Sequence, residues 1–154
     1  MLINNLDAAT SARLAVISFD ATLRAAALCL SRPGIGLVIV CSDAGAAAGV
    51  LTKSDLIRHL SRAGAADAPP TQPMTLPIVS QLMTRPVVSC EPGDDVYKVW
   101  QTMTQRKLQN IPVLGTDRKP VGTLDIRDAM QALFDQEQYQ ERMLIDYIDG
   151  IGYR

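Results

Sequence analysis

Residues 49–55 read GVLTKSD, and residues 122–128 read GTLDIRD. The glycine, the leucine and the final aspartate stand at matching places, and the two heptads begin 73 positions apart, at residues 49 and 122. An internal repeat indicates that one structural unit is used twice. The sequence therefore predicts two related units, each with its heptad at the junction between a strand and a helix.

The composition indicates a folded protein without an electrostatic preference for nucleic acid. Of the 154 residues, 47% are hydrophobic and 20% are charged, which permits a packed core. The formal net charge is −1 and aromatic residues are only 5%, so neither charge nor base stacking favours nucleic acid as a partner. No run of 18 apolar residues and no signal-peptide pattern occurs, so we expect no membrane segment.

The cysteines and the single histidine lack the spacing of a metal site. Cys29, Cys41 and Cys90 form an odd set without a CxxC pair, and His59 is alone. An odd set of unpaired cysteines fits a reducing compartment. We therefore expect no bound metal and a cytoplasmic location.

The first unit, residues 1–62, is expected to read helix, strand, strand, helix after an extended lead-in. Alanine and leucine dominate residues 21–30, which predicts a helix. Residues 36–41 form a continuous apolar run typical of a strand buried on both faces. A second strand at residues 50–51 leads into a helix from Lys53. Alanine and proline then dominate residues 63–77, which we interpret as a linker.

The second unit, residues 78–134, repeats this order. A short helical lead-in at residues 78–83 and an extended stretch at 87–89 precede a helix that begins after the aspartates at 94 and 95. Strands are predicted at residues 111–114 and 121–124, followed by a helix from Ile126. Each unit is about 50 residues, too few to bury a core alone, so we expect the two sheets to pack together.

A tail at residues 135–154 has no counterpart in the first unit. It contains a predicted amphipathic helix with an apolar stripe made of Met143, Leu144, Tyr147, Ile148 and Ile151. Such a stripe is too apolar to stay exposed on a monomer. It either folds back on its own domain or makes a dimer.

The heptads have two interpretations. Thr52 and Asp55 match a capping box, in which the two residues cap the start of a helix reciprocally, and Asp125 with Asp128 can act similarly. Alternatively, the preceding glycine lets a ligand approach the backbone, and the carboxylate one turn into the helix accepts ribose hydroxyls while free N–H groups face a phosphate.

The order of elements, the two heptads and the strand NIPVL at residues 110–114 resemble a tandem pair of CBS domains, also called a Bateman module, over residues 14–134. The resemblance implies an α+β fold with two repeats, each a small mixed three-stranded sheet with two helices. The repeats would pack sheet to sheet with pseudo-two-fold symmetry, followed here by the C-terminal tail. It also implies a stand-alone, bacterial-type regulatory protein with no obligatory cofactor. The expected ligands are AMP, ADP, ATP, NAD or S-adenosylmethionine.

The resemblance assigns the main cleft to the first heptad. Asp55 is expected to hold the ribose hydroxyls, and Thr52 to bond ribose or phosphate. The other residues expected around this ligand are Val50, Thr84, Val87, Val88, Arg106, Lys107, Leu108, Asn110 and Pro112. For Val87 and Leu108 the alternative is an ordinary core position, and for Arg106 and Lys107 it is a solvated charged face.

The second cleft departs from the family pattern. It would use Asp128 for ribose, with a wall made of Ala15, Val16, Ile35 and Leu37. Asp125 stands where the first heptad has threonine, and two like charges at ~4 Å cost of order 1–4 kcal/mol, so it would repel a phosphate. Arg127 would offset part of this repulsion. We expect one competent cleft and a second that is empty, weak or suited to a less anionic ligand.

Three classes of function compete. The leading one is a regulatory module that binds an adenosine ligand and signals to an unidentified effector protein, most simply as a homodimer. The alternative is a dimerisation or interaction module with vestigial clefts, which works through its tail. An enzyme is disfavoured because no nucleophile, Walker or metal-ligand motif occurs.

Overall fold

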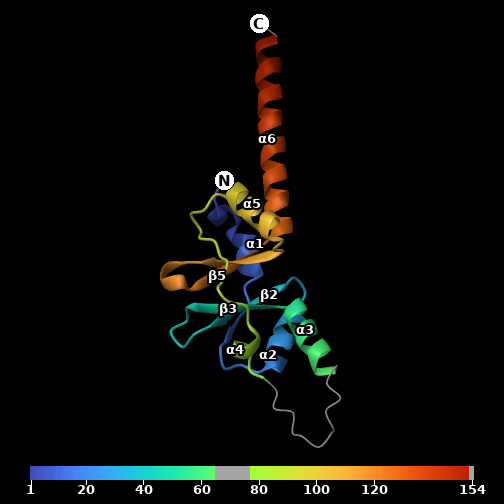
Figure 1. The fold of residues 1–154 in the computed structure, drawn as a ribbon. Helices are drawn as coiled ribbons and strands as arrows, with labels where there is room; N and C mark the ends of the chain where they lie inside the picture. Colours follow the sequence, from blue (N-terminus) through green and yellow to red (C-terminus); the bar gives the residue numbers. More distant parts are fainter. Residues whose placement is uncertain (65–76, 153–154) are drawn as a thin grey trace, which may run out of the picture.

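The structure, a computed structural model, describes residues 1–64 and 77–152 (Figure 1). Two small sheets lie one above the other, with helices on their outer sides, and a long helix extends away from the second sheet. Residues 65–76, which make up most of the predicted linker, lie outside the described residues. The α+β architecture with two sheet-containing repeats and a C-terminal helix is therefore confirmed.

The first sheet has three strands, as expected. β1 (Val16–Ser18) pairs in parallel with β2 (Leu37–Cys41), which pairs antiparallel with β3 (Ala47–Thr52). The first four residues of β2 are fully buried, as its continuous apolar run predicted. The helices are α2 (Leu23–Leu30) and α3 (Lys53–Gly64).

The second sheet has two strands instead of the expected three. β4 (Asn110–Leu114) pairs antiparallel with β5 (Pro120–Asp125) across the short turn η2 (Thr116–Arg118), and α5 (Val96–Arg106) precedes them. The expected third strand is reduced to one parallel bridge, in which the Cys90 N–H donates to the Pro112 carbonyl at 3.0 Å. The ladder stops there because Pro112 has no N–H and so cannot donate the next hydrogen bond to the segment that precedes Cys90.

The segments that lead into the two repeats are exchanged. η1 (Ile3–Leu6) and α1 (Asp7–Ala12) precede the first repeat in sequence, but Ile3 is buried in the core of the second repeat, and its N–H donates to the Asp94 carbonyl at 2.9 Å. Conversely, α4 (Val79–Leu82) places Val79 in the core of the first repeat. Within the predicted unit at residues 1–62, the N-terminal segment therefore packs on the second repeat, and the rest forms the first repeat.

The heptad glycines admit these exchanged segments. A Cβ on Gly122 would lie 2.9 Å from the Thr10 Cβ and 3.0 Å from its backbone carbonyl carbon, and a Cβ on Gly49 would lie 2.6 Å from the Met83 Cγ. Thr10 and Met83 are themselves 73 positions apart, the same spacing as the two glycines. The expectation that these glycines let a ligand approach the backbone was wrong, because the lead-in segments fill that space.

The two repeats also share a core. Leu37, Ile39 and Ala47 of the first sheet form one buried cluster with Leu114 of the second. This shared cluster confirms that the sheets pack against each other, as two small units require to bury their apolar faces.

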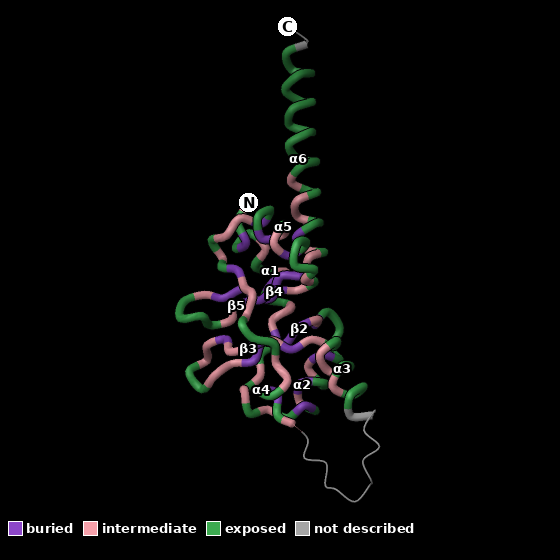
Figure 2. Tube along the Cα trace, viewed as in Figure 1, coloured by how far each residue is buried: buried purple, intermediate pink, exposed green. Residues whose placement is uncertain are grey.

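The last helix, α6 (Ile126–Gly152), is continuous over 27 residues. Its first turns pack on the second repeat through Ala129 and Leu133. Its outer half extends beyond the body of the protein and is exposed along its length (Figure 2). The apolar stripe at residues 143–151 therefore does not fold back on its own domain. Within residues 1–64 and 77–152, no helix is both long enough and apolar enough to cross a membrane.

Replacing Gly122 with alanine should destabilise the fold. The added methyl group would overlap the backbone of Thr10 as well as its side chain, and overpacking of this kind typically costs about 1–3 kcal/mol. Urea unfolding followed by circular dichroism measures the change. Gly93→Ala is the matched control, because a Cβ there meets nothing within 4 Å. Equal stability of the two variants would show that α1 does not pack on β5 as described.

Candidate ligand-binding cavity between the repeats

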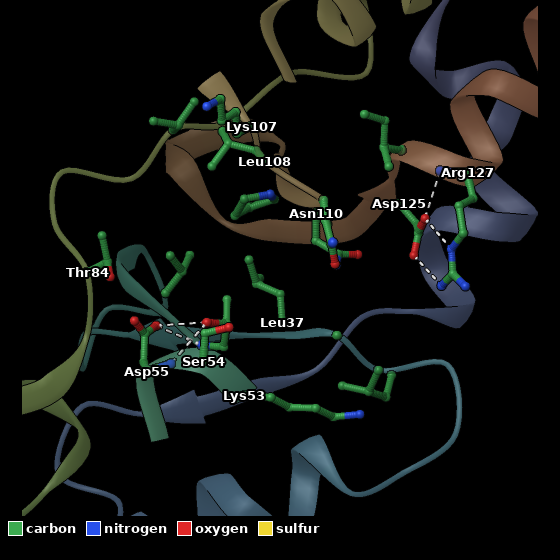
Figure 3. A pocket seen from close by; sticks show the side chains of 18 of the residues that line it. Leu37, Lys53, Ser54, Asp55, Thr84, Lys107, Leu108, Asn110, Asp125 and Arg127 are labelled. Atoms are coloured by element: carbon green, nitrogen blue, oxygen red, sulfur yellow. Dashed lines mark hydrogen bonds and ion pairs between the residues drawn. The ribbon is translucent and has the colours of Figure 1, made fainter. Parts of the chain in front are cut away.

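A cavity of about 840 Å³ lies between the two repeats (Figure 3). Its lining comes from the loop before β2, the β3–α3 junction, the segment after α4, the α5–β4 turn and the β5–α6 junction. Both heptads therefore open into one cavity. The residues that line it are Gly34, Ile35, Gly36, Leu37, Val50, Thr52, Lys53, Ser54, Asp55, Arg58, Thr84, Pro86, Val88, Lys107, Leu108, Gln109, Asn110, Pro112, Asp125, Ile126 and Arg127.

The first heptad forms the predicted capping box. The Thr52 N–H donates to Asp55 Oδ2 at 2.9 Å, and the Asp55 N–H donates to Thr52 Oγ1 at 3.4 Å. The other carboxylate oxygen, Oδ1, faces the guanidinium of Arg58 at 3.4 Å. The Arg58 side chain is 61% exposed, and exposed ion pairs contribute little, so a ligand can replace this partner at small cost.

The facing wall comes from the second repeat. Leu108, Asn110 and Pro112 supply apolar surface and one amide. The Oδ1 atom of Asn110 is buried and has no hydrogen-bond partner among the described residues. A Cβ on Gly36 would lie 2.6 Å from the Asn110 Nδ2, so the repeats touch at this point. An unpaired buried acceptor is costly.

The cavity carries an excess of positive charge. Asp55 has Arg58 and Asp125 has Arg127 as ion-pair partners. Lys53 and Lys107 also line the cavity, one on each repeat, and neither forms an ion pair within residues 1–64 and 77–152. The arrangement therefore favours an anionic ligand.

Asp125 in the second heptad is held by its own neighbour. The carboxylate accepts from the Arg127 backbone N–H at 2.8 Å and from the Arg127 guanidinium at 3.0 and 2.8 Å. Burial alone would raise the pKa of Asp125, but these hydrogen bonds and the charges of Arg127 and Arg13 outweigh it and hold the pKa below its ordinary value. Arg127 thus pairs with the Asp125 carboxylate, as expected, and offsets its negative charge.

Asp128 does not line the cavity. Its carboxylate accepts from Arg13 Nε at 2.6 Å and from Arg13 Nη2 at 3.2 Å. Arg13 lies directly after α1, and its Nη1 donates to the Gly34 carbonyl at 2.8 Å. The hydrogen bond to Asp128, together with its charge and that of Asp125, raises the pKa of Arg13 in spite of desolvation.

The structure brings together most of the residues predicted for the two clefts. Two residues predicted for the main cleft, Val87 and Arg106, lie outside the lining, as do three predicted for the second. Val87 lies between Pro86 and Val88, and alternate residues of an extended segment point to opposite sides. Arg106 is exposed in the last turn of α5. Ala15 is buried in the core of the first repeat, Val16 is exposed on β1, and Asp128 is paired with Arg13.

Sequence reasoning did not single out several lining residues. Lys53 and Ser54 belong to the first heptad, and Arg58 lies one turn further along α3, so the heptad and the helix that follows it could have indicated them. Arg13 gave no such signal. It meets Asp128, 115 positions away, only because α1 packs on the other repeat.

Comparison with known proteins identifies the class. Residues 7–62 and 79–135 each match the CBS domain. The chain belongs to the CBS domain family and carries two copies of the domain.

Curated relatives are longer than this chain. It is 31% identical over 126 residues to arabinose 5-phosphate isomerase GutQ of Salmonella typhi, covering 82% of this chain and 35% of that protein. It is 31% identical over 116 residues to GutQ of Escherichia coli K12, covering 75% of this chain and 33% of that protein. The chain thus spans about a third of the length of these relatives.

Solved structures share the fold. CBS-domain containing protein ATU1752 from Agrobacterium tumefaciens is 25% identical, with a TM-score of 0.69 over 86% of this chain and 98% of that one. The CBS domain pair of MJ0100, in complex with 5′-methylthioadenosine and S-adenosyl-L-methionine, is 19% identical, with a TM-score of 0.71 over 89% and 98%. PAE2072 from Pyrobaculum aerophilum, complexed with AMP, is 16% identical, with a TM-score of 0.67 over 83% and 89%.

The lowered pKa of Asp125 predicts a dependence of stability on pH. A carboxylate whose pKa is lower in the folded state adds stability above its unfolded value of about 3.9, and this stability is lost as the pH falls through the folded value. Urea unfolding at pH 7 and pH 3 should show a smaller acid loss for Asp125→Asn than for the parent chain. Asp43→Asn, an exposed turn position, is the control. An unchanged acid loss in Asp125→Asn would contradict the pairing with Arg127.

Proposed function

We propose that this chain is a regulatory module that binds an adenosine-containing nucleotide, such as AMP, ADP or ATP, in the half of the cavity built on Thr52 and Asp55. The carrying observation is the inter-repeat cavity, in which a carboxylate at a helix start faces an apolar wall, with lysines on both sides. Its volume lies in the range of about 300–1,000 Å³ that is usual for small-molecule sites. Two proteins of the same fold, described above with bound AMP or S-adenosyl-L-methionine, support the ligand class.

Each part of such a ligand has a chemical counterpart in the cavity. The Asp55 carboxylate would accept the ribose hydroxyls once Arg58 turns away, and the Thr52 hydroxyl would bond ribose or phosphate. The adenine would lie against Val50, Leu108 and Pro112. Lys53 and Lys107 would neutralise the phosphates, which favours a nucleotide over the cationic S-adenosylmethionine.

Ligand binding would act on the relation between the two repeats, because the cavity walls come from both. The proposed output is a change in their mutual orientation that an effector protein senses, with no catalytic step in this domain pair. The homodimer and the cytoplasmic location predicted from the sequence remain predictions.

Asp55→Ala should abolish nucleotide binding without unfolding the protein. Isothermal titration calorimetry with AMP, ADP and ATP on ligand-free protein tests this directly. Asp95→Ala is the matched control: Asp95 also caps a helix, accepting from the Lys98 N–H at 3.1 Å, but lies outside the cavity. Both variants lose a cap, which typically contributes about 1 kcal/mol, and only Asp55→Ala should lose binding. Unchanged binding in Asp55→Ala would refute the assigned site.

A second candidate function is an interaction module that works through α6. The observation that favours it is the apolar surface of the outer half of this helix, where Met143, Leu144, Ile145, Tyr147, Ile148 and Ile151 are each 49–66% exposed. A contiguous exposed apolar surface of this kind is typical of a protein–protein contact.

Deleting residues 136–154 tests this second function. If α6 is the main dimer contact, the solution mass measured by light scattering should fall from dimer to monomer. Ile148→Glu should have the same effect, whereas Leu28→Glu, at an equally exposed apolar position on α2, should not. A dimer that survives the deletion would argue against the tail as its main contact.

A further inference from the structure

We propose that Arg13 fills the place beside the cavity where a second ligand site would open at Asp128, and that it restricts each chain to a single nucleotide. Its guanidinium holds the Asp128 carboxylate, the group that corresponds by repeat position to the ribose-binding Asp55. The inference rests on the proposed function for the identity of the ligand, but it concerns residues that play no part in the Thr52–Asp55 half-site.

The internal repeat shows what is unusual about position 13. With the spacing of 73 that relates Gly49 to Gly122 and Asp55 to Asp128, Arg13 corresponds to Pro86. Arg13 directly follows α1, and Pro86 comes four positions after the end of α4 at Leu82. Pro86 lines the open cavity and has neither a charge nor an N–H. The same place in the second half-site therefore carries a long cation instead of a short neutral ring.

The guanidinium spans the gap where a second cleft would open. It donates to Asp128 of the second repeat at 2.6 and 3.2 Å, and to the Gly34 carbonyl of the first repeat at 2.8 Å. It also lies 3.6 Å from the carboxylate of Asp125. One side chain thus joins the two walls and uses both oxygens of Asp128.

The two half-sites differ in how firmly their carboxylates are held. In Asp55 the capping box holds Oδ2, while Oδ1 faces only the exposed Arg58, at 3.4 Å. In Asp128 both oxygens pair with Arg13, whose side chain is only 21% exposed. Two-point pairs between arginine and a carboxylate are the stronger kind. A neutral ribose would have to displace this pair, and Asp125 is already held by Arg127.

The experiment counts AMP molecules per chain by isothermal titration calorimetry. The variants are Arg13→Ala, Arg13→Gln and the double variant Arg13→Ala/Asp125→Thr, which restores the threonine of the first heptad. We expect one AMP per wild-type chain and one additional AMP in the double variant, with a weaker additional site in the single variants. Arg13→Lys, which keeps the cation, should bind the same number as wild type.

Counting the additional site separates this inference from the proposed function. Placed on Asp55→Ala, the double variant should bind one AMP where Asp55→Ala alone binds none. If the wild-type chain binds no AMP but the double variant gains a site, the proposed function fails and the role of Arg13 stands. Two equal AMP sites in the wild-type chain, or an unchanged number in folded Arg13→Gln and in the double variant, would overturn it.

Discussion

The exchange of lead-in segments is the interaction on which the rest of the structure depends. Thr10 packs on Gly122 and Met83 packs on Gly49, so each repeat is completed by chain that precedes the other. A unit of about 50 residues buries too little surface to be stable alone. Because Ile3 and Val79 each supply core to the other repeat, neither unit is complete alone, and the cavity between them takes its walls from both.

This exchange also makes the cavity asymmetric. By the repeat spacing of 73, Arg13 corresponds to Pro86, and the two side chains have opposite character. Asp125 adds to the difference, because it occupies the place of Thr52 and binds Arg127. The two heptads thus have similar backbone settings, and the two half-sites differ in the pairs Thr52/Asp125 and Pro86/Arg13.

Much of this arrangement can be predicted from residue patterns, and the exceptions have physical causes. The apolar run of β2, the capping box at Thr52 and the Asp95 cap of α5 depend on neighbours within a few positions, so local sequence indicates them. The prediction of a third strand in the second sheet was wrong, because Pro112 lacks the N–H that would continue the ladder of hydrogen bonds. The pairing of Arg13 with Asp128 could not be predicted, because it depends on a segment crossing to the other repeat.

The continuity of α6 connects the cavity to a distant surface. Ile126 and Arg127 line the cavity, and the same helix continues without interruption to Gly152. At 1.5 Å per residue, 27 residues make a rigid arm of about 40 Å. A tilt of about 5° at the base of such an arm moves its tip by about 3.5 Å, roughly the diameter of an atom. The helix therefore acts as a lever that amplifies displacement: a tilt at the cavity too small to disturb the core moves the far end by a larger distance.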